Sequence, residues 1–345
     1  MDDLALPDLL VLRGSVVAAS DEFFAGKENL IKPAAPVFTP HLFGPMGQIH
    51  DGWQTRRRRA EGERMPGPDV HDWVVARLGV PGVVHAVVVD TAFFTGNYPQ
   101  ACSVQACSAP GYPAPGELAG WTEIVPRSPL AGDSQHVFSV SARRRFTHVR
   151  LNIYPDGGVA RLRVHGEVVT APGMLDGLTF DLAALESGGD ITACSDEFYS
   201  APRHIISPGL SRAMGDGWET SRRRVPGHEW LVVRLAGQGL IRIAEIDTSG
   251  YLGNAPGEAA LEACCGEPAL PGSGDDSGAS WGELLPRTRL QPDTVHRFRI
   301  SGDTGPATHV KLSIYPDGGV ARLRLYGSLT PDGFAGLRER WQRTS

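Results

Sequence analysis

Histidine and carboxylate residues recur in adjacent pairs along this chain, in positions where they could move protons. His71-Asp72 and His228-Glu229 each stand directly before an apolar, β-branched run. Imidazole titrates near neutral pH and could shuttle a proton, and the same four residues could instead be metal ligands. The structural alternative is a hydrogen-bonded histidine where a strand begins.

A second pair of carboxylates is expected at the ends of strands. Asp90-Thr91 and Asp247-Thr248 close apolar runs and lead into Gly96-Asn97 and Gly253-Asn254. A carboxylate beside amide donors could act as a base with anchors for a ligand's oxygens. The structural alternative is that both aspartates cap turns.

Arginine runs supply the cationic groups. Asp51-Gly52-Trp53 leads into Arg56–Arg59, and Asp216-Gly217-Trp218 leads into Arg222–Arg224. One guanidinium from each run could bind a carboxylate through two hydrogen bonds. The rest of each run must face solvent, because four adjacent arginines cannot all reach one site.

These residues recur because the chain repeats itself. Residues 147–166 and 308–327 are identical at 16 of 20 positions. The blocks at 20–24, 51–59, 71–99 and 121–130 also reappear, in the same order, in the second half. The chain is therefore a duplicated domain, for which we predict boundaries at 1–175 and 176–345.

Within each repeat the pattern is that of β-strands. Residues 73–78 and 83–89 are apolar runs of strand length. Residues 148–154 and 159–164 alternate around a Pro-Asp-Gly-Gly turn, which predicts a hairpin with Arg161 and Arg163 facing outward. No long segment with helical periodicity stands out. Each repeat is therefore expected to be an antiparallel β-sandwich of jelly-roll type.

Composition limits the function classes. A chain of 345 residues with a net charge of −6 has no general attraction to nucleic acid or to anionic membranes. No apolar run approaches the length of a membrane span. The odd number of cysteines, five, and the acidic N-terminus favour reduced thiols and a cytoplasmic location.

Taken together, the blocks resemble the allantoicase repeat. The similarity rests on SDEFF, DGWQTRRRR, HDW, VDTAFFTGN and THVRLNIYPDGGVARLRVHG, with their counterparts in the second repeat. The resemblance implies a galactose-binding-like jelly roll in each half and hydrolysis of allantoate to ureidoglycolate and urea. A weaker similarity to discoidin-type carbohydrate-binding modules concerns the fold alone.

Cleavage of allantoate requires protonation of the leaving urea nitrogen, addition of water to the central carbon, and donors for the carboxylate and ureido oxygens. We therefore predict a site in this all-β fold that combines residues for proton transfer with residues that bind the substrate. The catalytic residues are Asp90, His71, Asp72 and Glu22, and the substrate-binding residues are Lys27, Asp51, Arg57, Thr91, Asn97 and Asn254.

The repeats differ where a site would form. Lys27 and His50 stand opposite Pro202 and Gly215, and Tyr98 stands opposite Ala255. Because the first repeat has the additional cation and titratable group, we predict that the working site uses its loops, with the second repeat lending residues or holding the geometry. In the alternative, those differences mark a decayed copy, and Asp247, Asn254 and His228 carry catalysis.

For partners, we expect a small-molecule substrate, a homo-oligomer, and neither nucleic acid nor membrane. No metal ligand is assigned, and the resemblance leaves open either no cofactor or a divalent ion such as manganese. Two rival functions remain, a lectin-like binding module without catalysis and a related hydrolase acting on ureidoglycolate or a guanidino compound. Release of urea from allantoate would discriminate among the three.

Overall fold

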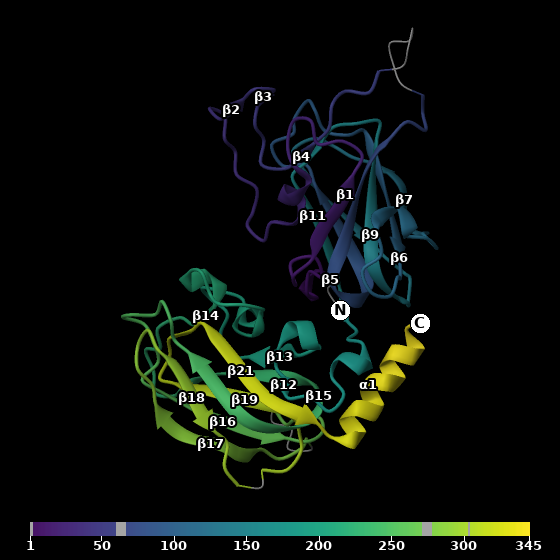
Figure 1. The fold of residues 1–345 in the computed structure, drawn as a ribbon. Helices are drawn as coiled ribbons and strands as arrows, with labels where there is room; N and C mark the ends of the chain where they lie inside the picture. The colour runs from purple at the N-terminus through teal and green to yellow at the C-terminus, as the bar shows by residue number, and fades with distance from the viewer. Residues whose placement is uncertain (1–2, 60–66, 271–277, 303) are drawn as a thin grey trace. The chain divides into compact units, whose positions relative to one another are not determined.

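The computed structural model describes residues 3–59, 67–270, 278–302 and 304–345. It divides into two compact units, Met1–Val169 with Thr344–Ser345, and Thr170–Arg343 (Figure 1). Both units consist mainly of antiparallel strands, which confirms the predicted all-β fold of two galactose-binding-like jelly rolls. The boundary drawn from the sequence after residue 175 falls just inside the second unit.

The first unit is built around one long strand. Its strands are β1 (Ser15–Ala19), β2 (Phe43–Gly44), β3 (Gly47–Gln48), β4 (Trp53–Gln54), β5 (Asp72–Asp90), β6 (Ala101–Cys107), β7 (Thr122–Pro129), β8 (Gln135–Ser139), β9 (Arg145–Tyr154), β10 (Gly158–Val159) and β11 (Arg161–Val168). Short 3₁₀ helices lie at Asp3–Ala5, Lys27–Ile31 and Pro115–Glu117.

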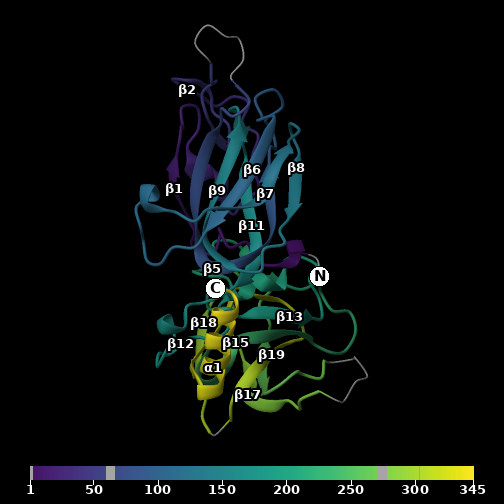
Figure 2. The same cartoon turned by 90° about the vertical axis from the view of Figure 1, so that its right-hand side faces the viewer.

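Strand β5 belongs to both layers of the sandwich. Its first part, from Asp72 to Arg77, pairs with β1 on one edge and β9 on the other. Its last part, from Gly82 to Asp90, pairs with β11 and β8. Strands β6 and β7 extend the β9 edge, and they lie beside β9 in Figure 2. The runs at 73–78 and 83–89 are therefore one continuous strand.

Two sequence expectations about this region are wrong. Strands β9 and β11 do not form a hairpin, because each pairs with β5 and not with the other. Arg161 does not face outward; its side chain is 2% exposed and donates to the backbone oxygens of Ala34 and Asp51. The alternating pattern identified both strands but not their partners.

The second unit repeats this arrangement. Its strands are β12 (Phe180–Asp181), β13 (Asp190–Cys194), β14 (Trp218–Glu219), β15 (Glu229–Asp247), β16 (Glu258–Cys264), β17 (Gly282–Arg289), β18 (Val295–Arg299), β19 (Ala307–Tyr315), β20 (Gly319–Val320) and β21 (Arg322–Leu329). Short 3₁₀ helices lie at Pro172–Met174, Leu185–Ser187, Pro202–Ile206 and Met214–Asp216. The central strand β15 pairs with β13, β19, β21 and β18, as β5 does with β1, β9, β11 and β8.

The chain also contains an α-helix that the sequence pattern did not reveal, α1 (Pro331–Arg343). Only Gly333 and Leu337 are buried in it, so its apolar stripe is narrow. None of the helices in the described parts of the chain is long and apolar enough to cross a membrane. All five cysteines are free thiols.

Two matched histidines should make the stability depend on pH. His148 and His309 are 2% and 5% exposed, and burial lowers the pKa of each below its ordinary value of 6.5. The unfolded chain therefore binds protons before the folded chain does. We expect the free energy of unfolding to be constant with respect to these groups above their ordinary pKa and to fall as the pH drops below about 6.5. Urea denaturation at several pH values measures this dependence. In the double variant His148→Gln with His309→Gln, the free energy of unfolding should decline less steeply below about pH 6.5 than in wild type. The same pH dependence in both proteins would contradict the expectation.

Candidate functional site

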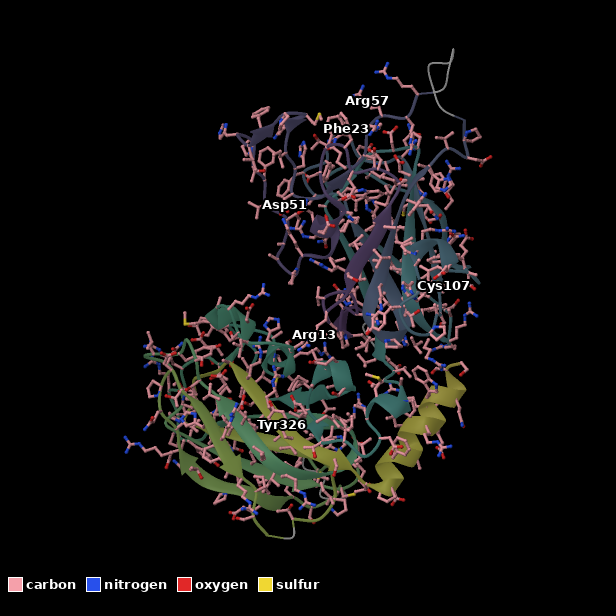
Figure 3. The ribbon with its side chains drawn as sticks, viewed as in Figure 1. Arg13, Phe23, Asp51, Arg57, Cys107 and Tyr326 are labelled. Carbon is pink, nitrogen blue, oxygen red and sulfur yellow. The ribbon has the colours of Figure 1, made fainter. Side chains whose placement is uncertain are left out.

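Residues predicted to form the site gather at one end of the first unit. Asp72 begins β5 and pairs with Ile153, whereas Asp90 ends β5 and pairs with Arg161. Because the short segment from Ile153 to Arg161 joins those two partners, both ends of β5 lie together. We call this the loop end, formed by residues 20–29, 50–59, 91–99 and 155–158. In Figure 3, Phe23 and Arg57 lie at this end, and Arg13 lies near the opposite end of the unit.

Asp72 is fully buried at the base of the loop end. Its Oδ1 accepts hydrogen bonds from Ser20 Oγ at 2.8 Å and Arg58 Nε at 3.0 Å, and Arg58 Nη2 also contacts it. The Arg58 backbone N–H donates to Asp156 Oδ2 at 2.6 Å. Asp72 therefore fixes the arginine run against the strands.

The neighbouring acidic block positions Arg56. Asp21 Oδ2 accepts the Arg56 backbone N–H at 2.7 Å, and its Oδ1 accepts Arg56 Nε at 2.8 Å. The Arg56 guanidinium also lies 4.8 Å from the centre of the Phe23 ring. Arg56 and Arg58 are thus both paired, on opposite sides of Arg57.

Arg57 differs from both neighbours. Its side chain is exposed, and no residue in the described part of the chain forms an ion pair with it. It lies in the loop end in Figure 3. An exposed guanidinium without an ion pair is available to an anionic ligand.

Glu22 and Lys27 form a charged loop at the same end. Glu22 Oε1 accepts the Lys27 backbone N–H at 2.9 Å, and Lys27 Nζ lies 3.1 Å from Glu22 Oε2 and 2.7 Å from Glu28 Oε1. The pKa of Lys27 is raised, first by its hydrogen bond to Glu28 and also by Glu22. Lys27 therefore stays cationic, with Glu22 exposed beside it.

Asp51 serves as an anchor for the loops. It pairs with Arg161 at 2.6 Å and with Lys32 at 2.9 Å, and it accepts the Val37 backbone N–H at 3.0 Å. Burial acts to raise its pKa, but these hydrogen bonds outweigh burial and lower the pKa to about 2. Both of its oxygens are therefore engaged within the unit.

Asp90 and Thr91 are also engaged by the fold. Asp90 accepts the Ala92 backbone N–H at 2.8 Å and Gln135 Nε2 at 3.0 Å. Thr91 is fully buried and donates to the Ala131 oxygen at 2.7 Å. Their geometry is that of the turn cap that the sequence left open as an alternative.

Phe94 forms the apolar floor of the loop end. A Cβ on Gly158 would lie 2.0 Å from its ring, so the strand can pass beneath Phe94 only as glycine. The His50 ring lies 5.0 Å from Phe94, and burial lowers the pKa of His50. The neutral imidazole forms no hydrogen bond with any residue whose placement is described.

Asn97 borders the same floor. Its backbone oxygen accepts the Gly158 N–H at 2.8 Å. Its side-chain amide forms no hydrogen bond with the described residues. Gly157, at φ 142°, lets the chain approach closely, since a Cβ there would lie 2.8 Å from the Asn97 oxygen. Asn97 is thus held by its backbone, and its side-chain amide is left without a hydrogen bond to the described residues.

His71 lies on the other side of Asp72. Its Nδ1 lies 2.8 Å from the Asp69 oxygen, and its ring lies 5.3 Å from Tyr154, over which Arg127 stacks at 4.1 Å. The ring is exposed. His228 repeats this contact against Tyr315 in the second unit.

Asp72 Oδ1 is a poor ligand position for a divalent ion, whereas Asp72 Oδ2 is buried and forms no hydrogen bond with the described residues. Asp72 Oδ1 is engaged by the cationic Arg58 and by Ser20, and a guanidinium at that oxygen competes directly with a metal. Across residues 3–59, 67–270, 278–302 and 304–345, no three His, Cys, Asp or Glu side chains come together as metal ligands.

The second unit keeps the anchors but not the unengaged asparagine amide. Arg223 pairs with Glu229, and Arg322 binds the Asp216 oxygen, as Arg58 and Arg161 do in the first unit. Asn254, however, donates to Glu219 Oε1 at 2.6 Å. Asn254 belongs to the second unit, and the other nine predicted site residues belong to the first.

Sequence reasoning missed two residues of the loop end, Gln54 and Phe94. A signal for both was present in the duplication, because Glu219 and Tyr251 stand at the matching positions. Glutamine against glutamate and phenylalanine against tyrosine change the polarity of these two positions within otherwise similar blocks, and that difference was the signal.

Comparisons with known proteins agree over nearly the whole chain. The model of a family described as "Allantoicase repeat" matches residues 8–169 and 180–330. A probable allantoicase of Nocardia farcinica is 51% identical over 94% of this chain and 94% of its own length. A probable allantoicase of Streptomyces coelicolor is 50% identical over 96% of this chain and 87% of its own.

A solved structure gives the same result. The crystal structure of allantoicase from Saccharomyces cerevisiae superposes with a TM-score of 0.73 at 33% identity. The match covers 93% of this chain and 92% of the yeast chain. Both the repeats and their fold are therefore shared with proteins of that description.

Proposed function

This chain belongs to the allantoicase family, and from that premise we propose that it hydrolyses allantoate to ureidoglycolate and urea at the loop end of the first unit. It is thus a hydrolase acting on C–N bonds of linear amidines. The observation that carries this location is the contrast between Asn97 and Asn254. The amide of Asn97 has no bond to the described residues, whereas that of Asn254 is held by Glu219.

In our proposal two cations bind the substrate, the exposed Arg57 and the partly buried Lys27. Arg57 is exposed and forms no ion pair with the described residues, so in our proposal it binds the carboxylate of allantoate through two hydrogen bonds. Lys27 and the Asn97 amide supply donors for the ureido oxygens. Asp51 and Thr91 support these groups from below by holding the loops.

Proton transfer requires side chains that substrate and water can reach. Of the four predicted catalytic residues, Glu22 and His71 are exposed. In our proposal the Glu22 carboxylate takes the proton of the attacking water, and His71 protonates the leaving urea nitrogen. Asp72 and Asp90 are buried, so they act as positioning residues through Arg58 and the 91–99 loop.

The reaction itself is the direct test. Purified protein should release one urea per allantoate at neutral to mildly alkaline pH. Because Arg58 engages Asp72, we also expect the rate to be the same with and without a chelator. Enzymatic urea detection on dialysed protein, with and without added manganese, measures both. The proposal is abandoned if allantoate is untouched under all of these conditions, and a chelator-sensitive rate would refute the metal-free part of it.

Two further expectations are part of the proposal. A cytoplasmic location is supported by the five free thiols. A homo-oligomer is supported by the apolar side chains exposed around the β2–β3 hairpin. The hairpin lies in the segment 25–50, which is longer than the corresponding segment 200–215 of the second repeat. These side chains are Val37, Phe38, Leu42, Phe43, Met46 and Ile49.

A further inference from the structure

We propose that Gln54 recognises a ureido arm of the substrate, an assignment that rests on the function proposed for the loop end. Gln54 lies in β4, bridged to Ala25 on one side and paired with Gly158 on the other. It is 9% exposed, and its Oε1 is buried without a hydrogen-bond partner. Its Nε2 forms no hydrogen bond with the residues that the structure describes.

The segments on both sides of Gln54 belong to the proposed site. Ala25 lies between Glu22 and Lys27, and the two Ala25–Gln54 backbone hydrogen bonds are 3.2 and 3.3 Å long. Gly158 is bonded to the Asn97 oxygen at 2.8 Å. Gln54 therefore joins the charged loop to the Asn97 loop.

The second unit shows what this position does when it carries an acid. Glu219 replaces Gln54, and its Oε1 accepts Asn254 Nδ2 at 2.6 Å. Tyr251, which replaces Phe94, donates to the Met214 oxygen at 2.5 Å. The second unit thus satisfies these polar groups internally, whereas in the first unit Phe94 has no polar group and Gln54 Oε1 is left without a hydrogen-bond partner.

A primary amide is chemically suited to a ureido group. The arm offers N–H donors beside a carbonyl acceptor, and glutamine offers a carbonyl acceptor beside N–H donors. A buried acceptor without a partner is costly, so a ligand that supplies an N–H gains more than it would at an exposed group. A carboxylate at position 54 would instead repel the anionic substrate. It could also accept a hydrogen bond from the Asn97 amide, as Glu219 does from Asn254.

Two substitutions test the assignment. Gln54→Met keeps the length of the side chain and removes both hydrogen-bonding atoms, and we expect kcat/KM for allantoate to fall about 10- to 100-fold. Gln54→Glu should lower it further, because it adds charge repulsion and offers Asn97 the bond seen in the second unit. The fold tolerates glutamate at this position, since Glu219 occupies it in the second repeat.

A pair of inhibitors separates recognition from a structural role. N-carbamoylglycine has one ureido arm and a carboxylate, whereas N-acetylglycine has a methyl group in place of the terminal amide. Wild-type protein should bind the first more tightly, and Gln54→Met should bind the two nearly equally. Glu219→Gln is the matched control, with kcat/KM expected within twofold of wild type.

The outcomes distinguish this inference from the proposed function. If Gln54→Met retains kcat/KM within twofold and still discriminates the two inhibitors, Gln54 does not read the ureido arm. That result leaves the proposed function intact as long as wild-type protein releases urea. Failure of wild-type protein to release urea would instead overturn the proposed function.

Discussion

Replacing Arg57 by alanine should lower kcat/KM for allantoate by about 10²-fold or more, with no change in the thermal unfolding temperature. A hydrogen bond to a charged group contributes about 1.5–3 kcal/mol, and 1.4 kcal/mol corresponds to a factor of ten. Free Arg57 is exposed, so its removal leaves no unpaired group in the fold. Steady-state kinetics and thermal unfolding of the same preparation measure the two quantities.

The matched control is Arg222→Ala. Arg222 stands at the same position in the second repeat and is also exposed, so it reports any general effect of losing a surface arginine. It should retain wild-type kcat/KM. A large loss at Arg222 with little change at Arg57 would place the working site in the second unit, with Asp247, Asn254 and His228 as its candidates.

Replacing Arg58 by methionine should, unlike Arg57→Ala, lower the stability of the fold by about 3 kcal/mol, the lower end of the range for breaking a buried ion pair. Asp72 is fully buried, and without Arg58 its carboxylate keeps only Ser20 as a side-chain partner. Chemical denaturation of wild type and variant measures the difference. Activity should fall as well, since the loop bearing Arg57 is held through Arg58.

Arg57→Ala is the neighbouring control for this experiment, because it alters the same run without touching Asp72. Asp72→Asn combined with Arg58→Met removes the buried charge and should recover part of the lost stability. An unfolding free energy for Arg58→Met equal to that of wild type would show that the pair contributes nothing to the fold.

Much of the fold could be predicted because the chain is duplicated. Repeated blocks defined two units, and apolar runs of strand length identified the halves of β5. Pairing could not be predicted in the same way, since alternation says which face of a strand is buried but not which strand lies beside it. The segment from 148 to 164 therefore read as a hairpin, although both of its strands pair with β5.

For the site, the sequence predicted which residues would lie there better than it predicted what each of them does. The blocks brought nine of the ten predicted residues to one end of the first unit. Whether a charge there is free or paired depends on tertiary contacts, and the alternating positions of a strand do not reveal them. Arg161 looked like a surface residue by alternation, yet it binds Asp51 in the interior. Arg56, Arg57 and Arg58 are adjacent in sequence, yet of these three only Arg57 forms no ion pair with the described residues.

The long central strand has a consequence for how each unit holds together. Since β5 contributes to both layers and pairs with β1, β9, β11 and β8, neither layer can separate without breaking hydrogen bonds of the same strand. Each unit should therefore open as one cooperative block rather than layer by layer. Local fluctuation is then left to the loops, and the residues that meet the substrate can adjust while the strands that carry them stay closed.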